Sequence, residues 1–327
     1  LRSHAVDHAI FYVGAPGVSL SRVHEESRLR NSIEEFLDRA SVNTDGWTGR
    51  TATDVRRAVR DHVGGDPSQR WALEPLDPAV RTLPWYGWVG LTLVAVMLSP
   101  VLVVGLLLVR MKEFGDDRRE ARRRATAVAD EATDREVSQP HRHVIDENIR
   151  AVTVREDHLV QNQLSHVVEV KPGWVRRAAL GALLPVLNFG ARHIYNQGSL
   201  LGVSTLHFVR WVLIDGGRRL MFLTNYDGSM INYVGDFVNK SWQIPSALTA
   251  IWSNTVRFPP TRWLLFAGAR DILRFTAFLR EHQVETQVWY SAYKRVTAGN
   301  IINNARIRRG LVGDFNEADT LEWLKRF

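Results

Sequence analysis

Two histidines in strand-like segments are the residues of this chain best suited to acid–base chemistry. His166 lies in the alternating run NQLSHVVEV, and His207 lies in STLHFVRWVLID, three residues before Arg210. An imidazole titrates near neutral pH, so it can transfer a proton or bind a ligand. If the two runs are neighbouring strands, both rings could line one cavity, or both could be hydrogen-bonded core residues. Alternation places His207 and Arg210 on opposite faces of the strand unless a bulge intervenes.

A polar turn follows the next predicted strand. NYDGS contains Asn225 and Asp227, whose residue types favour turns. A carboxylate and an amide at a strand end, beside the start of a new helix, also suit a polar or anionic ligand. Asp227, His207 and Arg210 are therefore the candidate catalytic residues, and His166 and Asn225 are candidate ligand-binding residues.

Three asparagines fall within about one turn of a helix near the end of the sequence. NIINNARIRR contains Asn300, Asn303 and Asn304, and Arg308 follows one turn later. Asparagine is a poor helix former, so this cluster requires a reason. Either it holds two structural repeats together, or Asn303, Asn304 and Arg308 bind a ligand in a polar pocket.

Several kinds of chemistry are excluded. The chain has no cysteine, so disulfides, thiolate metal sites and cysteine nucleophiles are impossible. Phosphate-loop, dinucleotide-binding, nucleophile-elbow and zinc-protease motifs are missing. His141 and His143 are in a predicted linker, and we expect no metal site there.

The net charge of +7 points to a lipid surface rather than to nucleic acid, because much of the basic excess directly follows the most apolar stretch. Residues 82–109 contain no charged side chain. This uncharged stretch is long enough for a membrane segment. Positive-inside bias places the region after Val109 in the cytoplasm. The residues expected at the membrane are Trp85 and Trp88 at one end, Pro100 in the middle, and Arg118, Arg122, Arg123 and Arg124 beyond the other end.

Two membrane geometries remain open. The segment is either a single span kinked at Pro100 or a hairpin that turns at Ser99–Pro100 and returns to the same side. Each hairpin leg would have about 14 residues, or about 21 Å of helix, too short to cross the apolar core of a bilayer.

An internal repeat bears on this choice. Residues 11–33 align without a gap with residues 289–311, and both copies predict a strand, a turn, a Ser or Thr, and then a helix. If two related units pack on each other, both lie on one side of the membrane, which favours the hairpin slightly. Because the sequence starts at Leu1, we expect further residues upstream of it.

The order of predicted elements defines the fold class. Residues 162–293 read as strand, helix, two strands joined at Gly216–Gly217, helix, strand, helix and strand. We therefore expect an α+β protein of two related ferredoxin-like units, the first partial, with an inserted membrane helix or hairpin. The predicted segments are a partial α+β unit at 1–81, the membrane segment at 82–112, a charged helix and linker at 113–155, and the second unit at 156–327.

Paired units of this kind resemble the dimeric α+β barrel superfamily, which includes dye-decolourising peroxidases, chlorite dismutases and small-molecule monooxygenases. RIRRG at residues 306–310 is similar to an arginine-rich turn of the peroxidases, and NYDGS is similar to their Gly-x-x-Asp-Gly loop without its first glycine. The resemblance covers residues 162–311 as a fold pattern. It implies haem, but no histidine stands near NIINNARIRRG to bind the iron, so the cofactor is left unknown.

Two functions follow from these observations. The first is a membrane-anchored accessory or scaffold protein that binds a protein partner, a second copy of itself or a small apolar ligand. The alternative is a membrane-bound, peroxidase-like oxidoreductase acting on a lipid-derived or redox-active small molecule. The lack of a complete catalytic motif favours the first, and the polar groups near strand ends favour the second.

Overall fold

The computed structural model forms two compact units. The sheet unit contains residues 1–14 and 82–290, and the helical unit contains residues 15–81 and 291–327. Each is described by itself below. The residues that the structure describes are 6–43, 47–76, 84–131, 147, 149–154, 156, 160–195, 198–200, 202–239 and 243–327.

The sheet unit is built on a five-stranded antiparallel sheet, which confirms the α+β class. The strand order is β1-β3-β4-β2-β7. The strands are β1 (Ile10–Val13), β3 (Leu206–Ile214), β4 (Arg219–Asp227), β2 (Gln161–Glu169) and β7 (Gln283–Val284). The long hairpin β3–β4 turns through η3 (Asp215–Gly217), where Gly216 and Gly217 have positive φ, as their sequence predicted.

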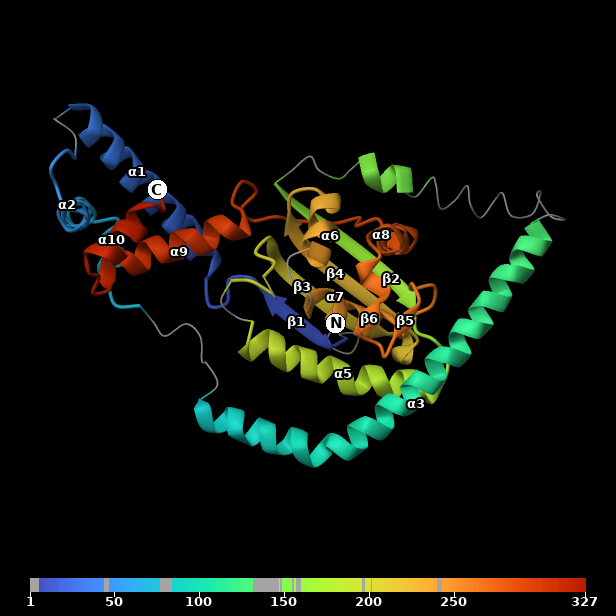
Figure 1. Ribbon diagram of the computed structural model, residues 1–327. Coiled ribbons are helices and arrows are strands. Elements are labelled where there is room, and N and C mark those ends of the chain that lie inside the picture. The colour runs from blue at the N-terminus through green and yellow to red at the C-terminus, as the bar shows by residue number, and fades with distance from the viewer. Residues whose placement is uncertain are drawn as a thin grey trace. The chain divides into compact units, whose positions relative to one another are not determined.

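One face of this sheet is covered by helices (Figure 1). They are α5 (Trp174–His193), α6 (Met230–Asn239), α7 (Gln243–Trp252) and α8 (Ile272–Glu281), with η4 (Gly268–Arg270) before α8. Alternate strand residues such as Leu164, Phe222 and Trp211 point to this face and pack around the buried indole of Trp252. Removing this apolar surface from water is the main stabilising contribution to the unit.

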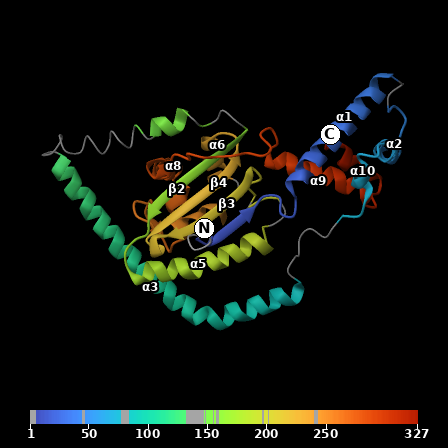
Figure 2. The same cartoon turned by 180° about the vertical axis from the view of Figure 1, so that it is seen from behind.

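The opposite face of the sheet, here called the open face, presents the other alternate residues. Figure 2, from behind, shows the strands of this face with no described helix of the sheet unit lying across them. Its apolar side chains are half-buried and lie among polar ones such as Gln163, Ser165, Arg210 and Asn225. The apolar ones include Phe11, Val167, Phe208, Val212, Met221 and Leu223.

The longest element is α3 (Trp85–Glu131), a single helix of 47 residues. Its backbone is helical through Ser99 and Pro100, so of the two geometries left open the hairpin, slightly favoured above, is wrong. Proline in a helix removes one backbone hydrogen bond and more often kinks the helix than reverses the chain. Among the residues that the structure describes, no helix reaches the length and apolarity required of a membrane span. The later part of α3 contacts α5 through an ion pair between Asp116 and Arg176, 2.8 Å apart.

The helical unit consists of α1 (Leu20–Asn43), α2 (Ala52–Gly65), η2 (Arg70–Leu73), α9 (Ala298–Val312) and α10 (Glu317–Leu324). Its described residues include no strand. The core of this unit is formed by Leu29, Ile33, Val59, Val63, Ala72, Ile307, Leu311 and Trp323.

The helices α1 and α9 contain the helical parts of the two aligned segments. Ser19 Oγ accepts a hydrogen bond from the Arg22 amide at 3.2 Å, and Thr297 Oγ1 accepts one from the Asn300 amide at 2.9 Å. These caps fall at equivalent positions of the repeat and begin the two helices in the same register. The equivalent apolar pairs Leu29/Ile307 and Ile33/Leu311 are all buried in the core of the helical unit.

The strand part of the repeat is wrong in the second copy. Phe11 and Tyr12 lie in β1, but Trp289 and Tyr290 lie outside the described strands. The last strand of the sheet is the short β7, which ends before Trp289 and Tyr290. Tyr290 is mostly exposed, so the alternating segment that contains it lacks the buried face that would specify a strand.

The two units also follow boundaries other than those predicted. The predicted first unit, 1–81, is divided, because β1 pairs with β3 in the sheet unit while α1 and α2 belong to the helical unit. The predicted second unit, 156–327, is divided at Ser291. Both boundaries depend on contacts between strands and helices that are far apart in the sequence. A local sequence pattern does not show such contacts.

Candidate functional site

A β-bulge positions His207. Leu206 pairs with Tyr226 and Phe208 pairs with Asn225, so His207 is an extra residue between two register positions. The Gly14 amide donates to the His207 carbonyl at 2.8 Å. A Cβ at position 14 would lie 2.1 Å from the Leu206 carbonyl oxygen, so only glycine permits this close approach of β1.

The bulge brings His207 to Asp227. His207 Nε2 lies 2.7 Å from Asp227 Oδ1, and the histidine side chain is 2% exposed. The Asp227 amide donates to the Thr205 carbonyl at 2.9 Å, which fixes the turn. A histidine that is oriented by an aspartate in this way can act as a general base, provided that its other ring nitrogen reaches a substrate.

A hollow of about 150 Å³ lies on the open face, lined by Gln163, Phe208, Arg210, Leu223 and Asn225. The Arg210 guanidinium sits over the Phe11 ring, 4.7 Å from its centroid. Asp227 is two residues from Asn225 on β4, so the two side chains share the open face of the sheet. Because His207 contacts Asp227, the bulge places His207 on this face, which is also the face of Arg210. The hollow is smaller than the roughly 300–1,000 Å³ of ordinary ligand pockets.

His166 lies on the other face, in the aromatic core. It is fully buried, and its ring centroid is 5.0 Å from that of Phe278 and 5.6 Å from that of His282. Burial and the neighbouring His282 lower the pKa of His166 to about 3, so the ring stays neutral. The structure therefore does not bring His166 and His207 together. The rings of Trp252, Phe278 and His282 pack around the His166 ring.

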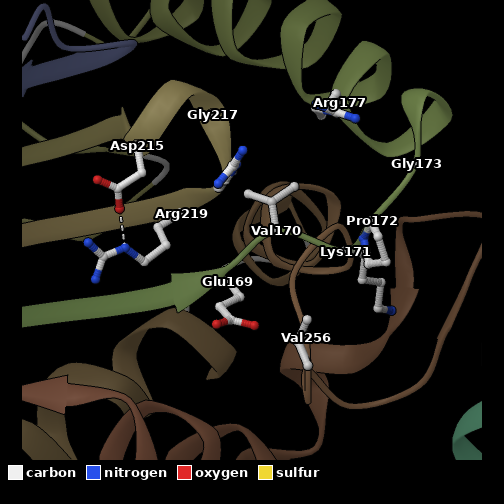
Figure 3. Close-up of a pocket in the computed structure, with 11 residues that line it drawn as sticks. Glu169, Val170, Lys171, Pro172, Gly173, Arg177, Asp215, Gly217, Arg219 and Val256 are labelled. Atoms are coloured by element: carbon white, nitrogen blue, oxygen red, sulfur yellow. Dashed lines mark hydrogen bonds and ion pairs between the residues drawn. The ribbon is translucent and has the colours of Figure 1, made fainter.

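A larger hollow, of about 840 Å³, lies where β2 ends and α5 begins (Figure 3). Asp215 and Arg219 form an ion pair on the side of the β3–β4 turn, and Arg177 on α5 lies across from them (Figure 3). Lys171 Nζ donates to the Ser253 carbonyl at 3.1 Å. The sequence did not predict this basic hollow, because its lining residues come from separate segments of the chain.

The asparagine cluster of α9 lies in the helical unit. Asn303 Nδ2 donates to the Arg326 carbonyl at 3.0 Å, which ties α9 to the segment after α10. Asn304 is buried, and Arg308 lies over the ring of Trp71 on η2, 5.2 Å from its centroid. Of the two readings left open by the sequence, these contacts favour the one in which the cluster holds helices together.

The equivalent of Asn304 in the repeat is Glu26 on α1, which is also buried. Burial raises the pKa of the Glu26 carboxyl from 4.5 to about 7, although Arg308 and Arg22 oppose this shift. The guanidinium of Arg22 also lies over Trp71, 4.2 Å from the ring centroid. A titratable group therefore sits inside the helical unit, between its two repeated helices.

The residues predicted to contact a membrane lie on α3. The side chains of Trp85 and Trp88 are exposed, and the Arg118 guanidinium lies 4.1 Å from the centroid of the Phe114 ring. Arg122 is exposed. The side chains of Pro100, Arg123 and Arg124 lie outside the described residues, as do His141 and His143. In the described part of the chain, no three His, Asp or Glu side chains are grouped for a metal ion.

Comparison of the chain with protein-family models, with curated proteins and with solved structures found no match.

Proposed function

We propose that the protein is a membrane-attached accessory or scaffold protein, held to the bilayer by the uncharged half of α3. The observation that supports this most strongly is the exposure of apolar side chains around that half of the helix. Burying such surface in a bilayer contributes about 25 cal/mol per Å². The most exposed of these side chains are Trp85, Tyr86, Leu93, Val96, Met97, Val103 and Val104.

The charge that follows supports the same attachment. Arg118, Arg119 and Arg122 come after the apolar half of α3, and each basic residue near an anionic surface contributes about 1 kcal/mol. Positive-inside bias then puts the region after Val109 on the cytoplasmic side.

Washing of native membranes tests the attachment. Because apolar burial is not screened by salt, the protein is expected to stay in the membrane fraction through high salt and through alkaline carbonate. A protein held only by its arginines would leave with salt. Release by both washes would refute the proposal.

The finer description of the fold belongs to the same proposal. The order β7-β2-β4-β3, with α5 between β2 and β3 and α8 before β7, supports a ferredoxin-like, split βαβ unit in the sheet unit. Such a unit leaves one sheet face free to pack. By the resemblance to dimeric α+β barrels, a protein partner or a second copy would cover the open face.

A charge on the open face tests this partner-binding role. Leu223 lines the small hollow there, and an aspartate in its place would have to lose its water when a partner packs on it. Leu223→Asp is expected to lower the molar mass of the detergent-purified assembly, measured by light scattering. Val288→Asp, at a mostly exposed position off the described strands, is the control. Equal masses for both variants and wild type would count against this surface.

The second candidate function is an enzyme, and the hydrogen-bonded His207–Asp227 pair, on the two strands that also line part of the open-face hollow, favours it. His207→Gln is expected to cost about 1–3 kcal/mol, because it removes the hydrogen bond between His207 and Asp227 in a largely buried site. Asp227→Asn, which keeps shape and turn propensity, is expected to cost under about 1 kcal/mol. Thermal unfolding measures both.

A visible absorption spectrum of protein purified from its native membrane separates the two functions. An accessory protein gives no haem band. A haem band that Asp227→Asn or His207→Gln abolishes, without loss of fold, would support the enzyme instead.

A further inference from the structure

The β5–β6 hairpin has an unusual backbone at its tip. It consists of β5 (Thr261–Arg262) and β6 (Phe266–Ala267). Trp263 has φ of 56° and Leu264 has φ of 59°, so two side-chain-bearing residues occupy the left-handed region. A turn with two such central residues is built with least strain from Asn-Gly. Here it is built from Trp-Leu, so the conformation must be imposed by its surroundings.

Glu113 of α3 imposes it. Its side chain is 1% exposed. Its carboxylate accepts hydrogen bonds from Thr261 Oγ1 at 2.7 Å, from the Trp263 amide at 2.9 Å and from the Leu264 amide at 2.8 Å. The two strained residues thus donate their amides to one buried carboxylate. The conformation of the hairpin depends on α3.

What this arrangement presents to solvent is apolar. Trp263 is 36% exposed, Phe266 is 51% exposed, and Leu265 between them is also exposed. Met111 and Phe114, on α3 beside Glu113, are exposed as well. The hairpin tip therefore extends the apolar surface of α3 onto the body of the sheet unit.

Basic side chains lie at the edge of this surface. The Arg110 guanidinium lies 5.8 Å from the centroid of the Trp263 ring, and Arg262 is exposed on the hairpin itself. Aromatic side chains next to arginines suit the boundary between acyl chains and anionic headgroups, where a ring is partly buried and a cation meets phosphate.

We propose that the tip of the β5–β6 hairpin is a second membrane contact, which inserts Trp263, Leu265 and Phe266 into the headgroup region of an anionic bilayer. This inference rests on the proposed attachment through α3 and adds to it. If α3 were the only contact, the orientation of the sheet unit relative to the bilayer would not be fixed. With the hairpin, Glu113 fixes one side of the unit against the bilayer surface.

The lack of cysteine permits a direct test. Single cysteines replace Leu265 in the hairpin, Met97 in the apolar half of α3, and Val288 as an exposed control. Each full-length variant is labelled with an environment-sensitive fluorophore and mixed with vesicles of phosphatidylcholine and phosphatidylserine in equal parts. Labels at Leu265 and Met97 are expected to shift to shorter wavelength and to be quenched by quenchers attached to lipid chains, and the Val288 label is not.

The outcomes separate the two proposals. A shift at Met97 without one at Leu265 overturns the hairpin contact and leaves the α3 attachment standing. No shift at either position overturns both.

Two further variants test the role of the strained turn. Glu113→Gln is expected to abolish the shift at Leu265 while the shift at Met97 remains. Trp263→Asn is the complementary variant, because asparagine accepts the left-handed conformation. It is expected to keep or raise the melting temperature and to weaken vesicle binding about tenfold. Unchanged vesicle binding by Trp263→Asn would show that the turn is only structural.

Discussion

Gly310→Ala is expected to destabilise the helical unit by about 3 kcal/mol. A Cβ at position 310 would lie 2.1 Å from both Cδ1 and Nε1 of Trp323, well inside van der Waals contact. Trp323 is buried, and its indole N–H donates to the Ile307 carbonyl at 2.9 Å. Moving the indole therefore costs both overpacking of the core, about 1–3 kcal/mol, and a buried hydrogen bond, about 1–3 kcal/mol.

Gly299→Ala in the same helix is the matched control. The nearest atom to a Cβ there is Thr297 Oγ1 at 3.7 Å, and alanine is the better helix former, so this variant is expected to be neutral or stabilising. Hydrogen exchange of peptides from α9 and α10 measures both variants within the full chain. If α9 and α10 are as well protected from exchange in the Gly310→Ala variant as in the Gly299→Ala variant, the packing of α9 on α10 described above is wrong.

The helical unit is also expected to lose stability as the pH rises from about 5 to 8. The pKa of Glu26 is about 7 in the folded unit and about 4.5 without burial. Between these values the folded state holds a proton that the unfolded state has released, so a rise in pH favours unfolding. The difference sets an upper limit of about 3 kcal/mol.

Glu26→Gln mimics the protonated carboxyl and is expected to remove this dependence. The charged groups that act on Glu26 are Arg308 from α9 and Arg22 and Glu25 from its own helix. Glu25→Gln, which removes a partly exposed neighbour, is the control and should leave most of the slope in place. Exchange protection of α1 and α9, measured across the pH range, gives the slope. The same slope in wild type and Glu26→Gln would assign the effect to another group.

Local signals predicted much of the fold. The Asp215–Gly217 turn joins β3 to β4 where Gly216–Gly217 predicted it, because turns depend on short stretches of sequence. The helices of the repeat also begin in register, at Ser19 and Thr297.

Features set by distant contacts were not predictable. The strand predicted between the last two helices of residues 162–293 is the β5–β6 hairpin instead, because its turn depends on Glu113, about 150 residues earlier in the chain. Alternation in the sequence also cannot show a bulge, and the bulge at His207 reverses the face predicted for that side chain.

In the candidate site, too, local sequence predicted some features and distant contacts set the others. His207 and Asp227, both candidate catalytic residues, lie 2.7 Å apart, because Asp227 ends β4 and His207 lies opposite it on β3. His166 was paired with them by residue type alone, but its alternation with Leu164 and Val168 places it in the core. The basic hollow beside α5 was missed, because its side chains come from three separated segments.

Vesicle flotation of the purified full chain tests the attachment through α3 most directly. In equal parts of phosphatidylcholine and phosphatidylserine, wild type is expected to float with the vesicles in high salt and at alkaline pH. A variant with lysine at Leu93, Met97 and Val104, all exposed on α3, is expected to stay in the protein fraction under the same conditions. A control with lysine at Val154, Ile231 and Val288, exposed elsewhere, should float like wild type. Flotation of the α3 variant together with the control, or release of wild type by salt, would contradict the account.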